Sequence, residues 1–225
     1  MREIVLDTET TGLDPKSGHR IIEIGCIELI NHVPTDDTYW RYVNPERDVP
    51  DEAFAIHGLS GKFLSNKPVF SDIVDTFMDF IANDPLIIHN ADFDLSFINF
   101  ELVAVGRAEL KRDRAVDTMI MAREKYPGSP ASLDALCKRF DIDNSHRSFH
   151  GALKDARLLA DVYLELIGGR QHGFDLEKIS QSSPVPPITT REKPVQISRS
   201  RPLTRKEIIN HKKFLKKISS PIWDS

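Results

Sequence analysis

Two carboxylates near the N-terminus are the first residues whose types and spacing can do chemistry. Asp7 and Glu9 follow an apolar run at residues 4–6 that is typical of a buried strand. Side chains two residues apart in a strand point to the same face, about 7 Å apart along it. Carboxylates held this close repel each other unless a cation lies between them or one is protonated. We therefore interpret the pair as part of a metal site; the alternative is a solvated strand end that carries two acids.

Three more residues with suitable chemistry lie further along the chain. Asp94 stands at the start of a helical pattern, and Asp155 interrupts the apolar side of the helical pattern at about 151–167, with His150 just before it. Taken singly, Asp94 would be an acid favoured by the helix dipole, and Asp155 would pair with Arg157 or a nearby lysine. All three together with the first pair are hard to explain as surface charges.

The segments that hold these residues resemble the three exonuclease motifs of the DEDDh family of 3′–5′ exonucleases. They are Asp-Thr-Glu-Thr-Thr-Gly at 7–12, His-Asn-Ala-x-Phe-Asp at 89–94 and His-x4-Asp at 150–155, in the order of the family. The resemblance covers about residues 1–168. Ile-His-Gly-Leu at 56–59 and a proline-rich tail make the chain most similar to the proofreading epsilon subunits of bacterial DNA polymerase III.

The resemblance implies a metal-dependent 3′–5′ exodeoxyribonuclease that hydrolyses mispaired 3′-terminal nucleotides to nucleoside monophosphates. Two Mg²⁺ or Mn²⁺ ions would stabilise the attacking, phosphoryl and leaving oxygens. Oxygen ligands without cysteine or paired histidine favour these ions over zinc. By resemblance, Asp7 would bridge both ions. Glu9 and Asp155 would complete the first ion, and Asp94 would hold the second through water.

By the same resemblance, His150 would be the general base that takes a proton from the attacking water. An imidazole suits this role because its ordinary pKa of about 6.5 lies near working pH. His150 and Asp155 are five residues apart, which corresponds to about 140° on an ideal helix. We therefore expect His150 on the loop before the helix, where it can move over the metals.

Substrate contacts are expected beside the motifs, at Asp7, Glu9, Thr10, Gly12, Leu13, His57, Asn90, Phe93 and Asp155. Phe93 offers a ring for base stacking, worth ~1–3 kcal/mol, while His57 and Asn90 would contact sugar or phosphate. For Phe93 and Leu13 the alternative is packing in the core. Single-stranded or frayed 3′ DNA ends suit a site that must separate the last nucleotides.

The elements that position these residues predict an α/β fold. Apolar runs at 4–6, 21–27 and 39–43 with short connections predict a three-strand antiparallel meander. Runs at 86–89 and 115–117, each followed by a helical pattern, add parallel strands. The expected architecture is a ribonuclease-H-like mixed five-stranded sheet flanked by helices. Residues 44–69, rich in proline, are expected to be irregular.

Charge divides the chain of 225 residues, whose net charge is −4. Residues 186–225 hold 10 Lys and Arg against 3 Asp and Glu, which leaves 20 against 31 in residues 1–185. We expect an exonuclease domain over 1–175, a flexible proline-rich linker over 176–203 and a basic C-terminal partner-binding segment over 204–225. The alternative for the tail is a disordered end that adds only solubility or non-specific DNA affinity.

The resemblance also implies partners: the alpha subunit of DNA polymerase III through the C-terminal tail, a small theta-like subunit and the sliding clamp. A candidate clamp-binding peptide begins at Gln171. No apolar run approaches the ~20 residues of a membrane span, and we expect no signal peptide, because acidic residues interrupt the N-terminal apolar run. Cys26 and Cys137 fit core positions, so we expect a cytoplasmic protein.

Two alternative functions remain. One is an RNA-trimming member of the same family, similar to ribonuclease T or oligoribonuclease, which would lack a long polymerase-binding tail. The other is a non-catalytic module that only bridges clamp and polymerase, against which the complete set of five acidic and histidine residues argues.

Overall fold

A mixed sheet organises the part of the chain that carries the motifs. The computed structural model describes residues 1–144, 149–168 and 202–217, and the chain divides into two compact units, 1–174 and 175–225. Within the described residues the sheet has five strands in the order β3-β2-β1-β4-β5. They are β1 (Arg2–Thr10), β2 (Ile21–Ile30), β3 (Val33–Tyr42), β4 (Leu86–Ile88) and β5 (Ala115–Asp117). The first three are antiparallel, and β4 and β5 run parallel to β1, which confirms the predicted architecture.

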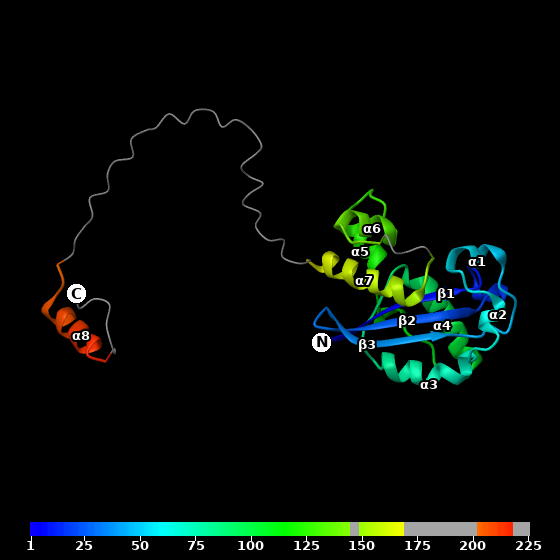
Figure 1. Ribbon diagram of the computed structural model, residues 1–225, viewed down its shortest axis with the longest axis horizontal. Helices are drawn as coiled ribbons and strands as arrows, with labels where there is room; N and C mark the ends of the chain where they lie inside the picture. Colours follow the sequence, from blue (N-terminus) through cyan, green and yellow to red (C-terminus); the bar gives the residue numbers. More distant parts are fainter. Residues whose placement is uncertain (145–148, 169–201, 218–225) are drawn as a thin grey trace, which may run out of the picture. The chain divides into compact units, whose positions relative to one another are not determined.

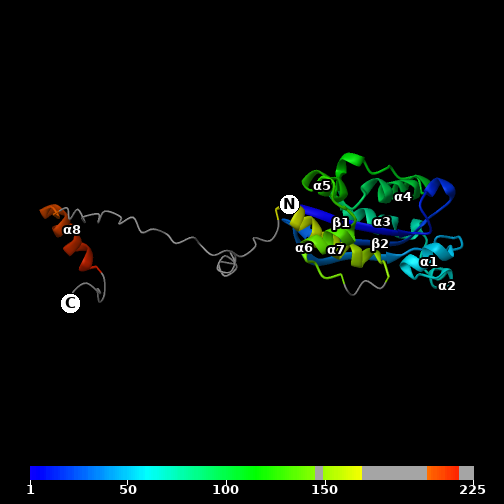
Figure 2. The same cartoon turned by 90° about the horizontal axis from the view of Figure 1, so that it is seen from above.

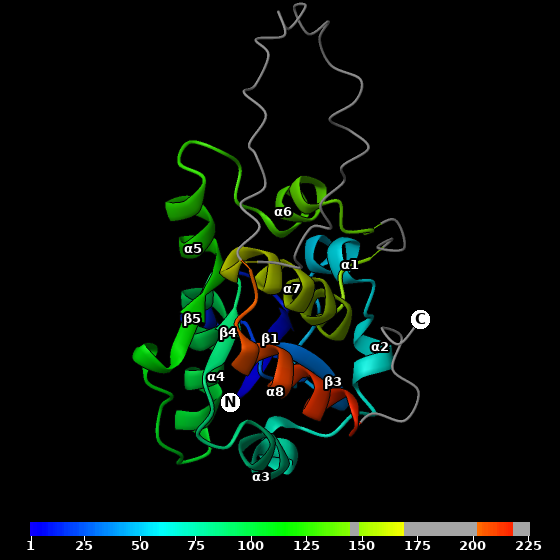
Figure 3. The same cartoon turned by 90° about the vertical axis from the view of Figure 1, so that its left-hand side faces the viewer.

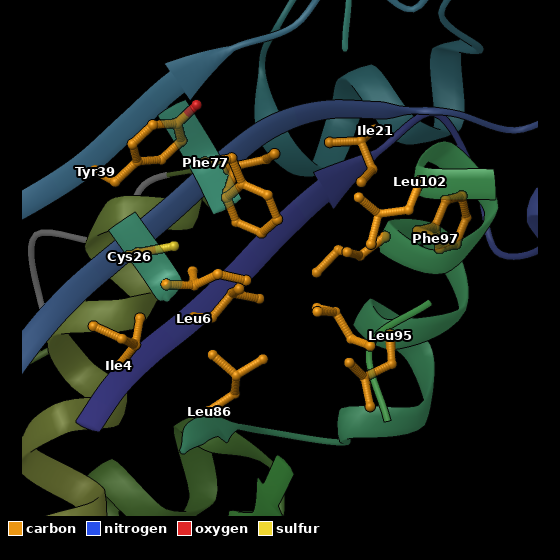
Figure 4. Packing of buried hydrophobic residues seen from close by; sticks show 14 of the residues in the cluster. Ile4, Leu6, Ile21, Cys26, Tyr39, Phe77, Leu86, Leu95, Phe97 and Leu102 are labelled. Atoms are coloured by element: carbon orange, nitrogen blue, oxygen red, sulfur yellow. The ribbon is translucent and has the colours of Figure 1, made fainter. Parts of the chain in front are cut away.

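Helices cover both faces of this sheet (Figures 1 and 3). One face packs against α3 (Phe70–Ile81) and α4 (Ala91–Ala104), and the other against α5 (Thr118–Lys125), α6 (Leu133–Phe140) and α7 (Ala152–Ile167). Because side chains alternate along β1, Ile4 and Leu6 enter the first core, whereas Val5 enters the second. Figure 4 shows the first core, where Leu6 lies among Cys26, Phe77 and Leu86.

The alternation in β1 also decides where the acids point. Asp7 and Glu9 share the face of Val5, and their antiparallel partners in β2 are Gly25 and Glu23. That face is the one covered by α7. The carboxylates therefore point toward α7, the helix that carries Asp155.

Two predictions for local structure were wrong. Residues 44–69 contain α1 (Asp51–His57) and α2 (Gly61–Leu64), which lie beyond the end of the sheet where β1 ends (Figure 2). Helices of one or two turns are too short to show a period, so the prolines dominated the pattern. The third strand begins at Val33 rather than at Tyr39; its first residues show no apolar alternation because they are mostly exposed on an edge strand.

The second unit is described only over 202–217. Its helix α8 (Arg205–Leu215) begins with a capping box, in which Thr204 Oγ1 accepts the Glu207 amide N–H and the Glu207 carboxylate accepts that of Thr204. Ile208, Ile209 and Phe214 are exposed on it. The predicted linker up to residue 201 and the clamp-binding peptide at Gln171 lie outside the described residues. Across the described segments, no helix is long and apolar enough to cross a bilayer.

Candidate active site

Close packing of α7 on β2 brings the last motif to the first. Gly25 has no side chain, and an ideal Cβ built there would lie only 2.3 Å from the carbonyl carbon of Ala152. The first turn of α7 therefore rests directly on the backbone of β2, beside Asp7. Through this contact Glu9, His150 and Asp155 each place one potential ligand atom within 4.8 Å of the others.

His150 lies on the loop just before α7, as predicted, because the helix begins after Gly151. Its Nδ1 is 3.2 Å from Oδ2 of Asp155, a buried carboxylate. Its backbone N–H donates to the carbonyl of Ile56 at 3.1 Å. The ring of Phe149 packs beside Gly58, 3.2 Å from the position of an ideal Cβ there. The loop that carries His150 therefore rests on the end of α1.

Asp94 reaches the end of β1 from the opposite layer, on α4. Its Oδ1 accepts two hydrogen bonds from Thr8, from the backbone N–H at 3.0 Å and from Oγ1 at 2.7 Å. Burial raises the pKa of the Asp94 carboxyl to about 7, although the bonds from Thr8 oppose this shift. The strand thus separates Asp94 from Asp155 while placing both beside the same strand end.

Two cavities adjoin at this strand end, since Thr8 and Glu9 line both. The smaller has a volume of about 240 Å³ and is lined by Asp7, Thr8, Glu9, His89, Ser132, Leu133, Asp134, His150 and Asp155. The larger, of about 530 Å³, includes six predicted substrate residues, namely Glu9, Thr10, Gly12, Leu13, His57 and Phe93. An acidic cavity beside a roomier and more apolar one suits a phosphate with its attached nucleoside.

The predicted substrate residues differ in exposure and in their position relative to the two cavities. Leu13 is 84% exposed, so its alternative role in the core was wrong. Phe93 both packs on Phe97 and lines the larger cavity. Asn90 is exposed, lines neither cavity and caps α4 with a left-handed backbone (φ 64°). The structure therefore brings all the predicted substrate residues except Asn90 to the cavities.

His57 is held as a hydrogen-bond donor. Its Nδ1 accepts the N–H of Leu59 at 2.9 Å, which puts the proton of the neutral ring on Nε2. Burial, with a smaller effect of His150, lowers the pKa of His57 and keeps the ring neutral. Nε2 is buried and has no hydrogen-bond partner among the described residues, so it is available to an acceptor oxygen of a ligand.

Residues at this site that the sequence did not predict include His19 and Glu23. His19 lines the larger cavity and lies over Gly12, where an ideal Cβ would be 2.3 Å from its ring; no sequence pattern indicated it. Glu23 is buried opposite Glu9. It did carry a signal, since it is an acid within the apolar run at 21–27.

The donor set fits hard divalent cations. Asp7, Glu9 and Asp155 supply carboxylate oxygens around the smaller cavity, and His150 is the imidazole beside them. Mg²⁺ and Mn²⁺ prefer oxygen ligands of this kind, whereas structural zinc sites use cysteine and several histidines. The residues present therefore suit the predicted ions.

Comparison with known proteins gives concordant matches. Residues 4–163 match the RNase T family, described as an exonuclease family. The DNA polymerase III subunit epsilon of Rickettsia felis is 51% identical over 222 residues, covering 97% of each chain. That of Escherichia coli K12 is 46% identical over 176 residues, covering 75% of this chain and 72% of its own.

Solved structures show the same fold. The nuclease domain of 3′hExo, a DEDDh family member bound to rAMP, has a TM-score of 0.65 at 18% identity and covers 74% of this chain and 91% of its own. Exonuclease X in complex with 5′ overhanging duplex DNA has a TM-score of 0.59 at 24% identity, covering 73% and 90%.

Proposed function

Because this chain belongs to the exonuclease family and, within it, to the epsilon subunits of DNA polymerase III, we propose that it removes mispaired 3′-terminal nucleotides from DNA as the proofreading subunit of a replicative polymerase. It is a 3′–5′ exonuclease associated with that polymerase. One observation carries the proposal beyond the family: Asp7, Glu9, His150 and Asp155 surround one cavity beside a second cavity of nucleotide size. A module that only bridged other subunits would not need this arrangement.

The acids have the role of holding two divalent ions. Asp7 would help to hold both ions, Glu9 and Asp155 would help to hold one of them, and Asp94 would support the other from the opposite layer. When bound, these ions would neutralise charge on the phosphate and lower the pKa of a water molecule. The crowding of four carboxylates, those of Asp7, Glu9, Asp134 and Asp155, around a cavity of about 240 Å³ supports this assignment, because such charges repel without a cation.

His150 is the general base. Its Nδ1 faces the Asp155 carboxylate, so Asp155 orients the ring, as a third group commonly does for a catalytic base. The other nitrogen, Nε2, would then accept the proton of the attacking water. The side chain is 44% exposed, which lets the proton pass to solvent afterwards.

The larger cavity holds the terminal nucleoside. The Phe93 ring and the exposed Leu13 side chain form apolar walls for the base, and the His57 Nε2–H donates to a sugar or phosphate oxygen. Thr10 Oγ1 donates to the Gly12 carbonyl at 2.6 Å and fixes the turn that closes this cavity. Frayed or single-stranded 3′ ends fit, because the nucleotide must leave its stack to enter.

The basic tail is the attachment to the polymerase. The exposed apolar residues of α8 stand among Lys and Arg, which suits a partner with an apolar groove and an acidic rim. We assign the tail to the alpha subunit, and the theta-like subunit and the sliding clamp as further partners. The protein works in the cytoplasm, at the replicating chromosome.

The decisive experiment compares three substrates with Mg²⁺: a primer with a mismatched 3′ end on its template, the matched primer, and a short RNA. Proofreading predicts that nucleoside monophosphates are released fastest from the mismatched DNA. Preference for the RNA would favour the RNA-trimming alternative instead.

Asp7→Ala tests the metal assignment with the same assay. Loss of a bridging ligand should abolish release while leaving the thermal unfolding midpoint near that of the wild type. Asp75→Ala, at an exposed acid on α3, is the matched control and should keep full activity. Full Mg²⁺-dependent activity in Asp7→Ala would refute the two-metal assignment.

A further inference from the structure

Glu23 joins two elements that flank the active site. Its side chain is buried, with 3% of the residue exposed, on the face of β2 that looks toward α7. Oε1 accepts the indole N–H of Trp40 on β3 at 2.6 Å, and Oε2 accepts the backbone N–H of Ala152 at 3.2 Å. One carboxylate thus ties an edge strand to the first residue of α7.

Both partners of Glu23 are pure donors, and this dictates the residue type. The first N–H groups of a helix lack partners within the helix, and Gly151 offers no side chain to cap α7. Glu23 acts as the missing cap from another strand. The two donors are bound by different oxygens, Oε1 and Oε2, and a glutamine would replace one of these acceptors with an NH₂ donor.

This bond acts close to the reacting groups. Ala152 lies two residues after His150 and three before Asp155, and the Asp155 N–H donates to the Gly151 carbonyl at 2.9 Å within the same turn. Any movement of this turn therefore moves both side chains. Gly25, two residues along β2, lets the same turn approach the sheet.

A buried carboxylate at position 23 lowers the free energy of unfolding relative to a well-packed apolar residue. The Glu23 carboxylate is buried near that of Asp155, and burying a charge costs free energy that well-packed apolar residues would not. The arrangement makes sense where the position of the turn matters more than the free energy of folding.

We propose that Glu23 is a positioning residue for the exonuclease reaction, which holds the first turn of α7 so that His150 and Asp155 meet the acids of β1. The inference rests on the proposed function. In this role Glu23 contacts neither the substrate nor a metal ion.

Glu23→Gln, compared with Glu3→Gln, tests this role. Glu3 is also a buried acid facing α7, but its Oε1 accepts the hydroxyl of Tyr163, two turns beyond Asp155. Release of nucleoside monophosphates from single-stranded DNA should show kcat lower by roughly 10–100-fold in Glu23→Gln, the usual effect of losing a supporting contact. KM should be unchanged, and Glu3→Gln should keep the wild-type kcat.

A second readout does not depend on activity. In metal-free protein, hydrogen exchange at the Ala152 amide and the Trp40 indole should accelerate in Glu23→Gln and stay at the wild-type rate in Glu3→Gln. Ala152→Pro removes the same hydrogen bond from the other side, at a helix position that tolerates proline. It should lower kcat even though the Glu23 carboxylate remains, which keeps the test open if Glu23→Gln does not fold.

Three outcomes would overturn the inference: a wild-type kcat in Glu23→Gln, equal losses of kcat in the two Gln variants, or a wild-type kcat in Ala152→Pro. A wild-type protein without nuclease activity would instead overturn the proposed function. The two failures are therefore distinguishable.

Discussion

Gly25→Ala should disturb the active site although it adds only one methyl group. The new Cβ would lie 2.3 Å from both the carbonyl carbon of Ala152 and the amide nitrogen of Leu153, and ordinary contact begins at 3.4 Å. Because backbone atoms cannot rotate away as a side chain can, the first turn of α7 must move by about 1 Å. Overpacking of this kind costs about 1–3 kcal/mol.

Gly25→Ala should lower the reaction rate by a large factor but the free energy of unfolding only moderately. A displacement of ~1 Å at reacting groups costs on the order of 100-fold in rate, and this turn carries Asp155 and follows His150. We expect the release of nucleoside monophosphates from a mismatched primer to fall by about that factor. The unfolding midpoint should drop by about 2–12 °C, which corresponds to 1–3 kcal/mol in a domain of this size.

Gly61→Ala is the matched control. The nearest atom to an ideal Cβ at Gly61 is Val49 Cγ2 at 4.0 Å, and Gly61 is the first residue of α2. Alanine should therefore fit and raise stability by about 0.5 kcal/mol without altering the rate. If Gly25→Ala matched Gly61→Ala in both rate and midpoint, the close packing of α7 on β2 would not govern the site.

Three further results are expected. Arg20→Gln should cost about 3 kcal/mol in urea unfolding, because the buried Glu101 carboxylate, 1% exposed, loses its paired bonds from Arg20 Nε and Nη2; a cost below about 1 kcal/mol would contradict this. Chelation by EDTA should stop nucleotide release, and restored Mg²⁺ should raise the unfolding midpoint by mass action, with Asp7→Ala showing no such rise. In metal-free protein, burial raises the pKa of Asp94 from 3.8 to about 7. Between these two pH values the folded protein keeps a proton on Asp94 that the unfolded chain has lost. Stability should then fall as pH rises from about 4 to 7, and Asp94→Asn should remove most of this slope in denaturation curves.

The sequence predicted those features that depend on short-range periodicity. Asp7 and Glu9 share a face because successive side chains of a strand point to opposite faces. His150 was expected before α7 because residues five apart do not lie on one face of a helix, and the helix does begin after Gly151. The sheet followed from five apolar runs and their spacing. These features required no knowledge of distant contacts.

Features that depend on two distant segments could not be predicted in the same way. The motifs predict that four acids form one cluster. In the structure, Asp94 instead comes from the layer opposite Asp155, and it accepts hydrogen bonds from Thr8, whose side chain points to the other face of β1 from Asp7 and Glu9. His57 Nε2 carries the ring proton because Nδ1 accepts the backbone N–H of Leu59. This contact lies at the end of α1, a helix that the proline-rich sequence did not predict. Glu23 was visible as an acid in an apolar run, but its partners lie on β3 and α7.

The position of α7 as the last described helix of the first unit has a consequence for synthesis of the protein. A ribosome completes β1 with Asp7 and Glu9 long before Asp155 emerges, and domains generally fold from the N-terminal side first. A growing chain can therefore pair β1 with β2 while its acids still lack their helical partner. If His150 and Asp155 have the proposed roles, nuclease activity requires α7 to be docked on Gly25, and incomplete chains would not cleave DNA.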